Sequence, residues 1–307
     1  MFRYFVNSEY KPLKAVLLCQ PCPEIENSDN PLEVLHLKRI DYAGIKKEYE
    51  QIVKVYKKLK IKVLSINSKK IENTDDRHVF NLIFTRDLFF MTPRGAIMAK
   101  MFSDIRRDEV QYAERTLISR GVCIRKSIQG SGTFEGADAL WVNDHLVVVG
   151  IGKRTNAIGF QQLEKELKRD GIRCVGVPAP VDTLHLLGAL QFVDSDLALV
   201  RIDLVQKEVI NFLKKNKISI IAIPENTETV KRQAMNFVVA GPKKIIMASH
   251  CPQTKKNCKR ASIKIAAEIP LTQLVNGGGG PACVTGILAR FSESTCFESS
   301  RPKLKKP

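Results

Sequence analysis

Four residues with the chemistry of an enzyme active site recur along the sequence at nearly regular intervals. They are Asp87, Glu135, His185 and Cys283. Glu135 follows Asp87 by 48 residues, His185 follows Glu135 by 50, and Cys283 follows His185 by 98, about twice either gap. Asn236 lies near the position that this spacing skips. If the spacing reflects a structural repeat, the four side chains converge on one pocket with a nucleophile, a base and two carboxylates.

Such a set of residues suits chemistry on a planar cation. Two carboxylates attract a guanidinium group, whose five N–H donors allow bidentate pairing. A nearby cation also stabilises a thiolate, so Cys283 could attack the guanidinium carbon. His185 would protonate the departing amine and then activate water. Hydrolysis of the covalent thiouronium adduct would give a ureido product.

The residues around Cys283 favour its role as a nucleophile. Asn276 is followed by four glycines, Gly277 to Gly280, and then by Pro281. Glycine allows backbone conformations closed to other residues and a close approach of a ligand. The alternative is a glycine-rich loop beside a buried cysteine, because a single cysteine needs a histidine partner elsewhere in the sequence to become a strong candidate.

Each of the other three residues also has a purely structural alternative. Asp87 could cap a turn or pair with Arg86. Glu135 could be a turn residue beside Gly136, and His185 could be a hydrogen-bonded histidine of the core. Their common position within a repeat favours a shared site instead.

The elements that must position these residues repeat with a period near fifty residues. A strand at 13–19, a helix at 44–59 and a strand at 61–66 come first. The units that follow are predicted as strand pairs at about 80–101, 134–151, 182–202 and 234–248, helices at 105–119, 157–169 and 203–215, and single strands at 121–125, 172–177 and 217–223. The segment up to residue 270 is less clear, and the glycine stretch opens one more unit.

A helix between strands in each unit indicates an α/β architecture. Five ββαβ units that close on themselves predict a five-bladed, pseudo-symmetric α/β propeller, in which equivalent positions face one centre. We expect one domain over residues 1–307, because no linker or low-complexity segment interrupts the chain. The basic tail at about 297–307 is expected to be peripheral.

The composition, with 44% hydrophobic and 26% charged residues, is ordinary for a globular protein. No apolar run reaches membrane-spanning length and the N-terminus lacks the apolar segment of a signal peptide, so we expect a cytoplasmic protein. The net charge of +17 favours anionic partners. Because the basic residues are spread along the chain without interleaved aromatic residues, we expect a solvated basic surface and neither membrane nor nucleic-acid partners.

Eight cysteines are too few for a disulfide-dense scaffold of this length. The pair Cys19 and Cys22 and the group His250, Cys251 and Cys258 invite a zinc interpretation. Neither spacing completes a familiar zinc finger, and Cys19 ends a strand-like run. We therefore expect thiols rather than a metal site.

Several segments together resemble the guanidino-group-modifying enzyme superfamily, whose members have the pentein fold. The superfamily includes arginine deiminases, dimethylarginine dimethylaminohydrolases and amidinotransferases. The resemblance runs from Leu13 to about Leu288 and is carried by residues 84–87 (FTRD), 134–138 (FEGAD), 152–156 (GKRTN), 184–186 (LHL) and 278–285 (GGGPACVT). Each segment is a modest signal, but their order and spacing are specific.

The resemblance implies a role for individual residues. Cys283 matches the nucleophile and His185 the general acid/base. Glu135 matches the carboxylate that works with the histidine, and Asp87 matches a guanidinium-binding carboxylate. Arg154 lies where the family places an arginine that binds the substrate α-carboxylate, although a surface arginine at a helix entrance is the alternative.

Other residues are weaker candidates for substrate contacts. Asp138 belongs to one of the matching segments and is a candidate substrate-binding residue. Lys100 and Arg107 could bind the anionic end of a substrate, with surface charge as their alternative role. The loop from Cys22 to Pro31 is a candidate lid because of its composition.

One position departs from the arginine deiminases. They usually carry an aspartate two residues after the histidine, where this sequence has Leu187. Dimethylarginine hydrolases also lack that aspartate, and an apolar side chain could accommodate a substituted nitrogen. The sequence is also short for the helical insertion typical of arginine deiminases. The resemblance thus implies a homodimeric hydrolase without metal or cofactor. Its substrate would be a small guanidino compound, arginine or N-methylated arginine, which it would convert to citrulline and ammonia or an alkylamine.

Two other functions stay open at this point. An amidinotransferase would use an amine in place of water as the second nucleophile, which sequence cannot separate from hydrolysis. Some proteins of pentein-like fold bind the ribosome without doing chemistry, and a net charge of +17 would allow RNA contact. The joint presence of Asp87, Glu135, His185 and Cys283 favours an enzyme, because a binding protein has no need of them.

Overall fold

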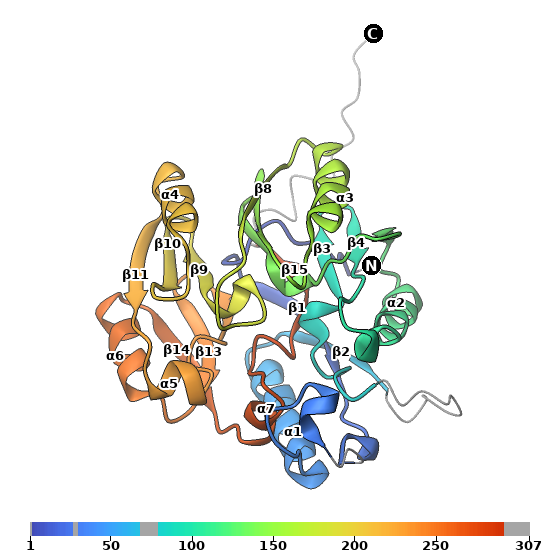
Figure 1. The fold of residues 1–307 in the computed structure, drawn as a ribbon. Coiled ribbons are helices and arrows are strands. Elements are labelled where there is room, and N and C mark those ends of the chain that lie inside the picture. The colour runs from blue at the N-terminus through green and yellow to red at the C-terminus, as the bar shows by residue number, and fades with distance from the viewer. Residues whose placement is uncertain (1, 27–29, 68–78, 292–307) are drawn as a thin grey trace.

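Five small β-sheets surround a common centre in the computed structural model of the protein (Figure 1). The structure describes residues 2–26, 30–67 and 79–291. The predicted peripheral tail at 297–307 lies outside these ranges, as do residues 27–29 of the predicted lid. Within them, no helix is long and apolar enough to cross a membrane.

Four of the sheets belong to units that have the predicted order of strand, strand, helix and strand. In one of them, β6 (Ala139–Asn143) pairs antiparallel with β7 (Leu146–Ile151), and β7 pairs parallel with β8 (Arg173–Pro178). Helix α3 (Ala157–Lys168) connects β7 to β8. Strand geometry accounts for this order, since a tight turn joins antiparallel strands whereas parallel strands need a longer crossover.

The other three sheets of this kind repeat the pattern. Their elements are β3 (Phe89–Thr92), β4 (Gly95–Met98), α2 (Glu109–Ser119) and β5 (Ile124–Ser127); β9 (Leu190–Asp194), β10 (Leu197–Arg201), α4 (Lys207–Lys215) and β11 (Ser219–Ile223); and β12 (Val238–Gly241), β13 (Lys244–Ala248), α6 (Pro252–Arg260) and β14 (Lys264–Ile269). The segment that the sequence left unclear therefore holds α6 and β14. Two short helices, α5 (Thr227–Lys231) and α7 (Gln273–Asn276), lie outside this pattern.

The fifth sheet joins the two ends of the described chain. Strand β1 (Leu13–Cys19) pairs antiparallel with β15 (Gly286–Arg290) and parallel with β2 (Lys62–Ile66). Helix α1 (Tyr42–Lys58) connects β1 to β2. The unit that the glycine stretch opens is thus completed by the N-terminal elements, which closes the ring as five blades.

A short 3-10 turn precedes the first strand of three units and explains the common phase of the site residues. The turns span Thr85–Asp87, Gly136–Asp138 and Leu186–Gly188, and the second contacts both others. Asp87 lies in the first turn, while Glu135 and His185 immediately precede the other two. The same turns explain why the strand pairs begin later than the sequence predicted.

Apolar packing between neighbouring units holds the turns in place. Trp141 of β6 is fully buried, and its ring stacks on Phe90 of β3 at a centroid distance of 5.5 Å. The indole N–H of Trp141 donates a hydrogen bond to the carbonyl oxygen of Met91 at 3.1 Å, which satisfies the polar atom of this buried ring. The units that carry Asp87 and Glu135 are therefore joined rigidly.

Gly136→Ala is expected to lower the free energy of unfolding by about 2 kcal/mol or more. A Cβ at this position would lie 2.2 Å from the carbonyl oxygen of Phe89 and 2.6 Å from that of Arg86, so the backbone must shift. Denaturant unfolding measures the change. Gly241→Ala is the matched control, because its added Cβ would meet only Pro12, at 3.9 Å; equal stabilities of the two variants would contradict the prediction.

Candidate active site

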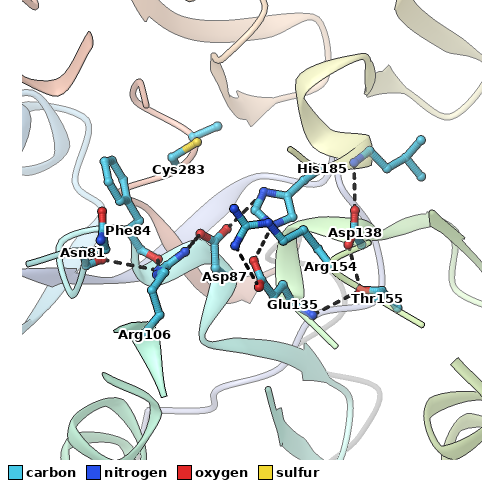
Figure 2. Close-up of polar contacts among 12 residues, drawn as sticks. Asn81, Phe84, Asp87, Arg106, Glu135, Asp138, Arg154, Thr155, His185 and Cys283 are labelled. Carbon is cyan, nitrogen blue, oxygen red and sulfur yellow. Dashed lines mark hydrogen bonds and ion pairs between the residues drawn. The ribbon is translucent and has the colours of Figure 1, made fainter. Parts of the chain in front are cut away.

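Three of the four predicted residues line one cavity of about 920 Å³, a volume typical of small-molecule sites. They are Asp87, His185 and Cys283, and Glu135 contacts His185. Figure 2 shows these side chains around a common space, with Cys283 above the row formed by Asp87 and His185. The cavity wall is built from several units, so the ring must close before the site exists.

His185 and Glu135 form a buried ion pair. Nε2 of His185 lies 2.6 Å from Oε2 of Glu135, and Glu135 is fully buried. Burial alone would lower the pKa of His185, but the carboxylates of Asp87, Glu135 and Asp138 outweigh it and raise that pKa to about 9. Burial likewise opposes the charge of Glu135, yet His185 and two nearby arginines lower the pKa of Glu135 to about 2. At neutral pH the pair is therefore an imidazolium and a carboxylate.

One carboxylate oxygen of Asp87 accepts a hydrogen bond from a described residue and the other accepts none. Oδ2 accepts a hydrogen bond from Nη1 of Arg106 at 2.6 Å. Oδ1 is buried and has no hydrogen-bond partner among the described residues, and Nδ1 of His185 lies 3.8 Å from it. A buried carboxylate oxygen without a partner is costly, and a cationic ligand with N–H donors would satisfy it.

Arg106 is the residue of this site that sequence reasoning missed. Its side chain is buried and pairs with Oε2 of Glu109 at 2.8 Å as well as with Asp87. Burial raises the pKa of Glu109 to about 7 even beside this arginine. Arg106 therefore fixes the orientation of Asp87 on the cavity wall.

Two of the predicted substrate contacts lie on the protein surface, away from the cavity. Arg107 pairs with Asp104, and 69% of its side chain is exposed. Lys100 is exposed, and its Nζ atom donates a hydrogen bond to the carbonyl oxygen of Gly130. Neither residue lines the cavity, and we assign them to the surface. In the sequence Arg106 and Arg107 look alike, because only packing decides which one is buried.

Asn236 holds Cys283 in place from the unit that the sequence spacing skips. Its Nδ2 atom donates a hydrogen bond to Sγ of Cys283 at 2.8 Å. Its Oδ1 atom accepts from the backbone N–H groups of Ala282 at 2.9 Å and Cys283 at 3.1 Å. Gly280 permits this approach, because a Cβ there would lie 2.9 Å from Cβ of Asn236. Burial and the charge of Asp87 raise the pKa of the Cys283 thiol to about 11, against the lowering effect of the Asn236 hydrogen bond.

Asp138 braces the loop that carries His185 and does not line the cavity. Its Oδ1 atom accepts from the backbone N–H of Leu186 at 3.0 Å, and its Oδ2 atom accepts from the hydroxyl of Thr155 at 2.7 Å. The Thr155 hydroxyl in turn accepts from the backbone N–H of Glu135 at 3.2 Å. Because both oxygens of this buried carboxylate are occupied, we interpret Asp138 as a positioning residue rather than the substrate contact that the sequence predicts.

Arg154 and Leu187 lie on the cavity wall. Nη1 of Arg154 is 3.5 Å from Oε1 of Glu135, and its side chain is 11% exposed. This single long contact leaves the guanidinium able to pair with an anion in the cavity. Leu187 is buried within the turn that His185 precedes, and it presents an apolar surface to the cavity.

Within the described ranges, one group of residues has potential ligand atoms close enough together to hold a metal ion. It consists of Asp87, Glu135 and His185. Arg106 and Arg154 contact the two carboxylates, and their positive charges oppose a divalent cation there. The two cysteine groups considered for zinc form no such cluster in those ranges. The two arginine charges therefore disfavour a divalent metal ion at the group of Asp87, Glu135 and His185.

Comparison with known proteins gives matches to enzymes of arginine chemistry. The family model for arginine deiminase matches residues 77–212, which include Asp87, Glu135 and His185. A dimethylarginine dimethylaminohydrolase of Pseudomonas aeruginosa is 23% identical over 250 residues, 81% of this chain and 91% of that protein. An arginine deiminase of Borreliella afzelii is 25% identical over 250 residues, 68% of this chain but only 61% of that protein, less than two thirds of its length.

Solved structures share the fold. The dimethylarginine dimethylaminohydrolase of Pseudomonas aeruginosa in complex with citrulline has a TM-score of 0.72 at 21% identity, covering 91% of this chain and 100% of that chain. This chain has the pentein fold of the guanidino-group-modifying enzymes. An amidinotransferase from Microseira wollei also has a TM-score of 0.72, at 15% identity, over 94% of this chain and 98% of that one. The predicted five-bladed fold and the predicted resemblance are therefore confirmed.

Asn236→Asp is expected to make the thiolate of Cys283 harder to form. The substitution keeps the oxygen that accepts from the backbone of Ala282 and Cys283, but it replaces the donor to Sγ with a second anionic oxygen. Alkylation of Cys283 by iodoacetamide at pH 8–9 should slow at least about tenfold, the equivalent of one pKa unit. Mass spectrometry of the Cys283 peptide distinguishes it from the other cysteines.

Asn216→Asp is the control for this experiment. It makes the same change at the end of α4, away from the cavity, and should leave the alkylation rate as it is. If Asn236→Asp also leaves the pH profile of alkylation unchanged, the hydrogen bond to Sγ does not stabilise the thiolate.

Proposed function

We propose that this protein is a hydrolase that cleaves a C–N bond of a guanidino compound through a covalent adduct with Cys283. The observation that carries the proposal is the Oδ1 atom of Asp87, which accepts no hydrogen bond from the described residues and lies 3.8 Å from Nδ1 of His185, on the wall of the cavity that Cys283 also lines. A planar cation bound to this oxygen would lie among a nucleophile, a general acid and two carboxylates. The matches to arginine deiminase and to a dimethylarginine hydrolase support this class of reaction.

Binding would begin with the guanidinium group on Asp87. Arg106 holds the other oxygen of Asp87, so the carboxylate is preorganised and the cation need not reorient it. At the far end of an arginine-like substrate, the α-carboxylate would pair with Arg154 on the cavity wall. Two fixed charges would thus align the substrate with Cys283.

The chemistry would proceed in two steps, neither of which uses a metal or a cofactor. In the first, the Cys283 thiol loses its proton to water, and Sγ forms a bond to the guanidinium carbon. His185 donates a proton to the departing nitrogen, which leaves as ammonia or an alkylamine when the C–N bond breaks. In the second, neutral His185 takes a proton from water, whose oxygen attacks the thiouronium carbon. The C–S bond then breaks to leave a ureido product and Cys283.

The charges of the resting site suit this order of events. A pKa of about 9 keeps His185 protonated at neutral pH, as a general acid must be. A pKa of about 11 keeps Cys283 a thiol until a cation lies beside it. The guanidinium of the substrate would stabilise the thiolate, so the substrate itself would activate the nucleophile.

Arginine and N-methylated arginine are the proposed substrates, with citrulline as the common product. Leu187 occupies the position where arginine deiminases usually carry an aspartate. Its buried apolar side chain offers no third carboxylate to an unsubstituted guanidinium, and it could contact methyl groups on a nitrogen. The proposal therefore favours N-methylated arginine, with release of an alkylamine.

Cys283→Ser is expected to lower kcat for arginine or dimethylarginine at least about a thousandfold, because the nucleophile is lost. Citrulline, ammonia and dimethylamine are measured for the wild-type protein and the variant. Cys123→Ser, at an exposed cysteine, is the matched control and should keep full activity. Unchanged turnover in Cys283→Ser would rule out the covalent mechanism. A new guanidino product on addition of glycine, in place of citrulline, would indicate amidinotransfer instead.

A cationic alkylating agent is expected to react with Cys283 at lower pH than a neutral one. Iodoacetamide should react faster as the pH rises toward the thiol pKa of about 11, whereas 2-chloroacetamidine carries a planar cation that stabilises the thiolate. Its pH profile should be shifted at least about one unit lower. Asp87→Asn should abolish the shift. Identical profiles for the two reagents in the wild-type protein would show that the site does not activate Cys283 through a bound cation.

A further inference from the structure

Exposed apolar side chains gather at the mouth of the cavity. Ten large hydrophobic side chains are exposed in the described part of the chain. Four of them line this one cavity, and their exposed fractions are 69% for Leu32, 60% for Leu37, 56% for Leu184 and 55% for Val230. Single exposed hydrophobic residues are ordinary, but a group at one opening marks a binding surface. We call these four residues the apolar rim.

The apolar rim is built from segments that are far apart in the sequence. Leu32 lies in the 3-10 turn Pro31–Val34, and Leu37 follows it. Leu184 directly precedes His185, and Val230 belongs to α5. A ligand group on this rim would therefore be continuous with the reacting groups below it.

The charged residues of the cavity offer few carboxylates that could pair with the ammonium group of a free amino acid. Among the described residues, three arginines line its wall, and each faces a carboxylate: Arg106 faces Asp87 at 2.6 Å, Arg154 faces Glu135 at 3.5 Å, and Arg201 faces Glu225 at 2.6 Å. The contact of Arg154 is the longest, so this arginine is best placed to receive a carboxylate. Asp182 is an exposed carboxylate on the wall that could meet an ammonium group, whereas the leucines could not.

We propose that the preferred substrate is an arginine whose α-nitrogen carries an apolar acyl group. This inference rests on the proposed guanidino hydrolase function. The guanidinium would meet Asp87 and Cys283, the carboxylate would meet Arg154, and the acyl group would cover the apolar rim. A cavity of about 920 Å³ has room for such a ligand. Acylation also replaces the ammonium charge by a neutral amide, which suits a rim of leucines.

The test compares kcat/KM for arginine, Nα-acetylarginine and Nα-benzoylarginine, with the ureido product and ammonia as readouts. We expect kcat/KM to rise in that order, with the benzoyl compound at least about tenfold above the acetyl compound. The acetyl compound separates the loss of the ammonium charge from the apolar contact. Equal values for the two acylated compounds, or a higher value for free arginine, would overturn the inference while leaving the hydrolase function intact.

Substitutions in the apolar rim test where the acyl group binds. Leu32→Ser and Leu184→Ser should each lower the ratio of kcat/KM for the benzoyl compound to that for the acetyl compound at least about threefold. Ile118→Ser is the matched control, because Ile118 is 58% exposed on α2 and lies outside the cavity. A ratio that responds to Ile118→Ser as strongly as to the rim substitutions would count against the apolar rim.

The inference and the function it rests on fail in different ways. No turnover of the three compounds or of dimethylarginine, with no reaction between Cys283 and 2-chloroacetamidine, would refute both. Gel filtration tests another occupant of the apolar rim. A dimer of the wild-type protein that Leu184→Ser dissociates would place a second copy of the chain on the rim, and it would overturn the acyl inference alone.

Discussion

Buried charges are tolerated only when they are paired, and this constraint governs the centre of the protein. Asp87 faces Arg106 and Glu135 faces His185, each at 2.6 Å and almost without exposure to solvent. Removing one partner of such a pair typically costs about 3–5 kcal/mol, because the other charge stays buried. The turns and strands around the cavity must therefore hold these groups at hydrogen-bond distance. The Oδ1 atom of Asp87 accepts no hydrogen bond from the residues that the structure describes, and the proposed function follows from this.

The ring of sheets supplies the site by giving one polar residue from each unit. Asp87, Glu135, His185, Asn236 and Cys283 each precede the first strand of a unit, and equivalent positions of the units face the same centre. The closing sheet matters most for Cys283, because β15 pairs with β1 and so fixes this residue against elements from the other end of the chain. Asn236 completes the set by holding both the sulfur and its backbone.

The two proposals place reactivity deep in the cavity and substrate specificity at its mouth. The proposed reacting groups are charged, buried and held by hydrogen bonds, which keeps their geometry independent of the ligand. The mouth is apolar and exposed, with leucines from separate segments that could adapt to the outer part of a ligand. The proposed mechanism depends on the first region, while the proposed choice among guanidino compounds depends on the second and on Leu187.

The repeat, the fold and the four converging residues could be predicted from the sequence, because strand and helix patterns are local and the polar residues share their phase. The sequence could not separate Arg106 from Arg107, since the two are chemically alike and only the packing around Asp87 buries one of them. It also suggested Asp138 as a substrate contact, whereas the tertiary structure occupies both oxygens of that carboxylate with Leu186 and Thr155. The apolar rim could not be predicted from the sequence either, because packing decides which leucines are exposed. Whether a side chain is exposed, and which residue it pairs with, depends on segments that meet only when the ring closes. Only the tertiary structure could therefore decide these properties.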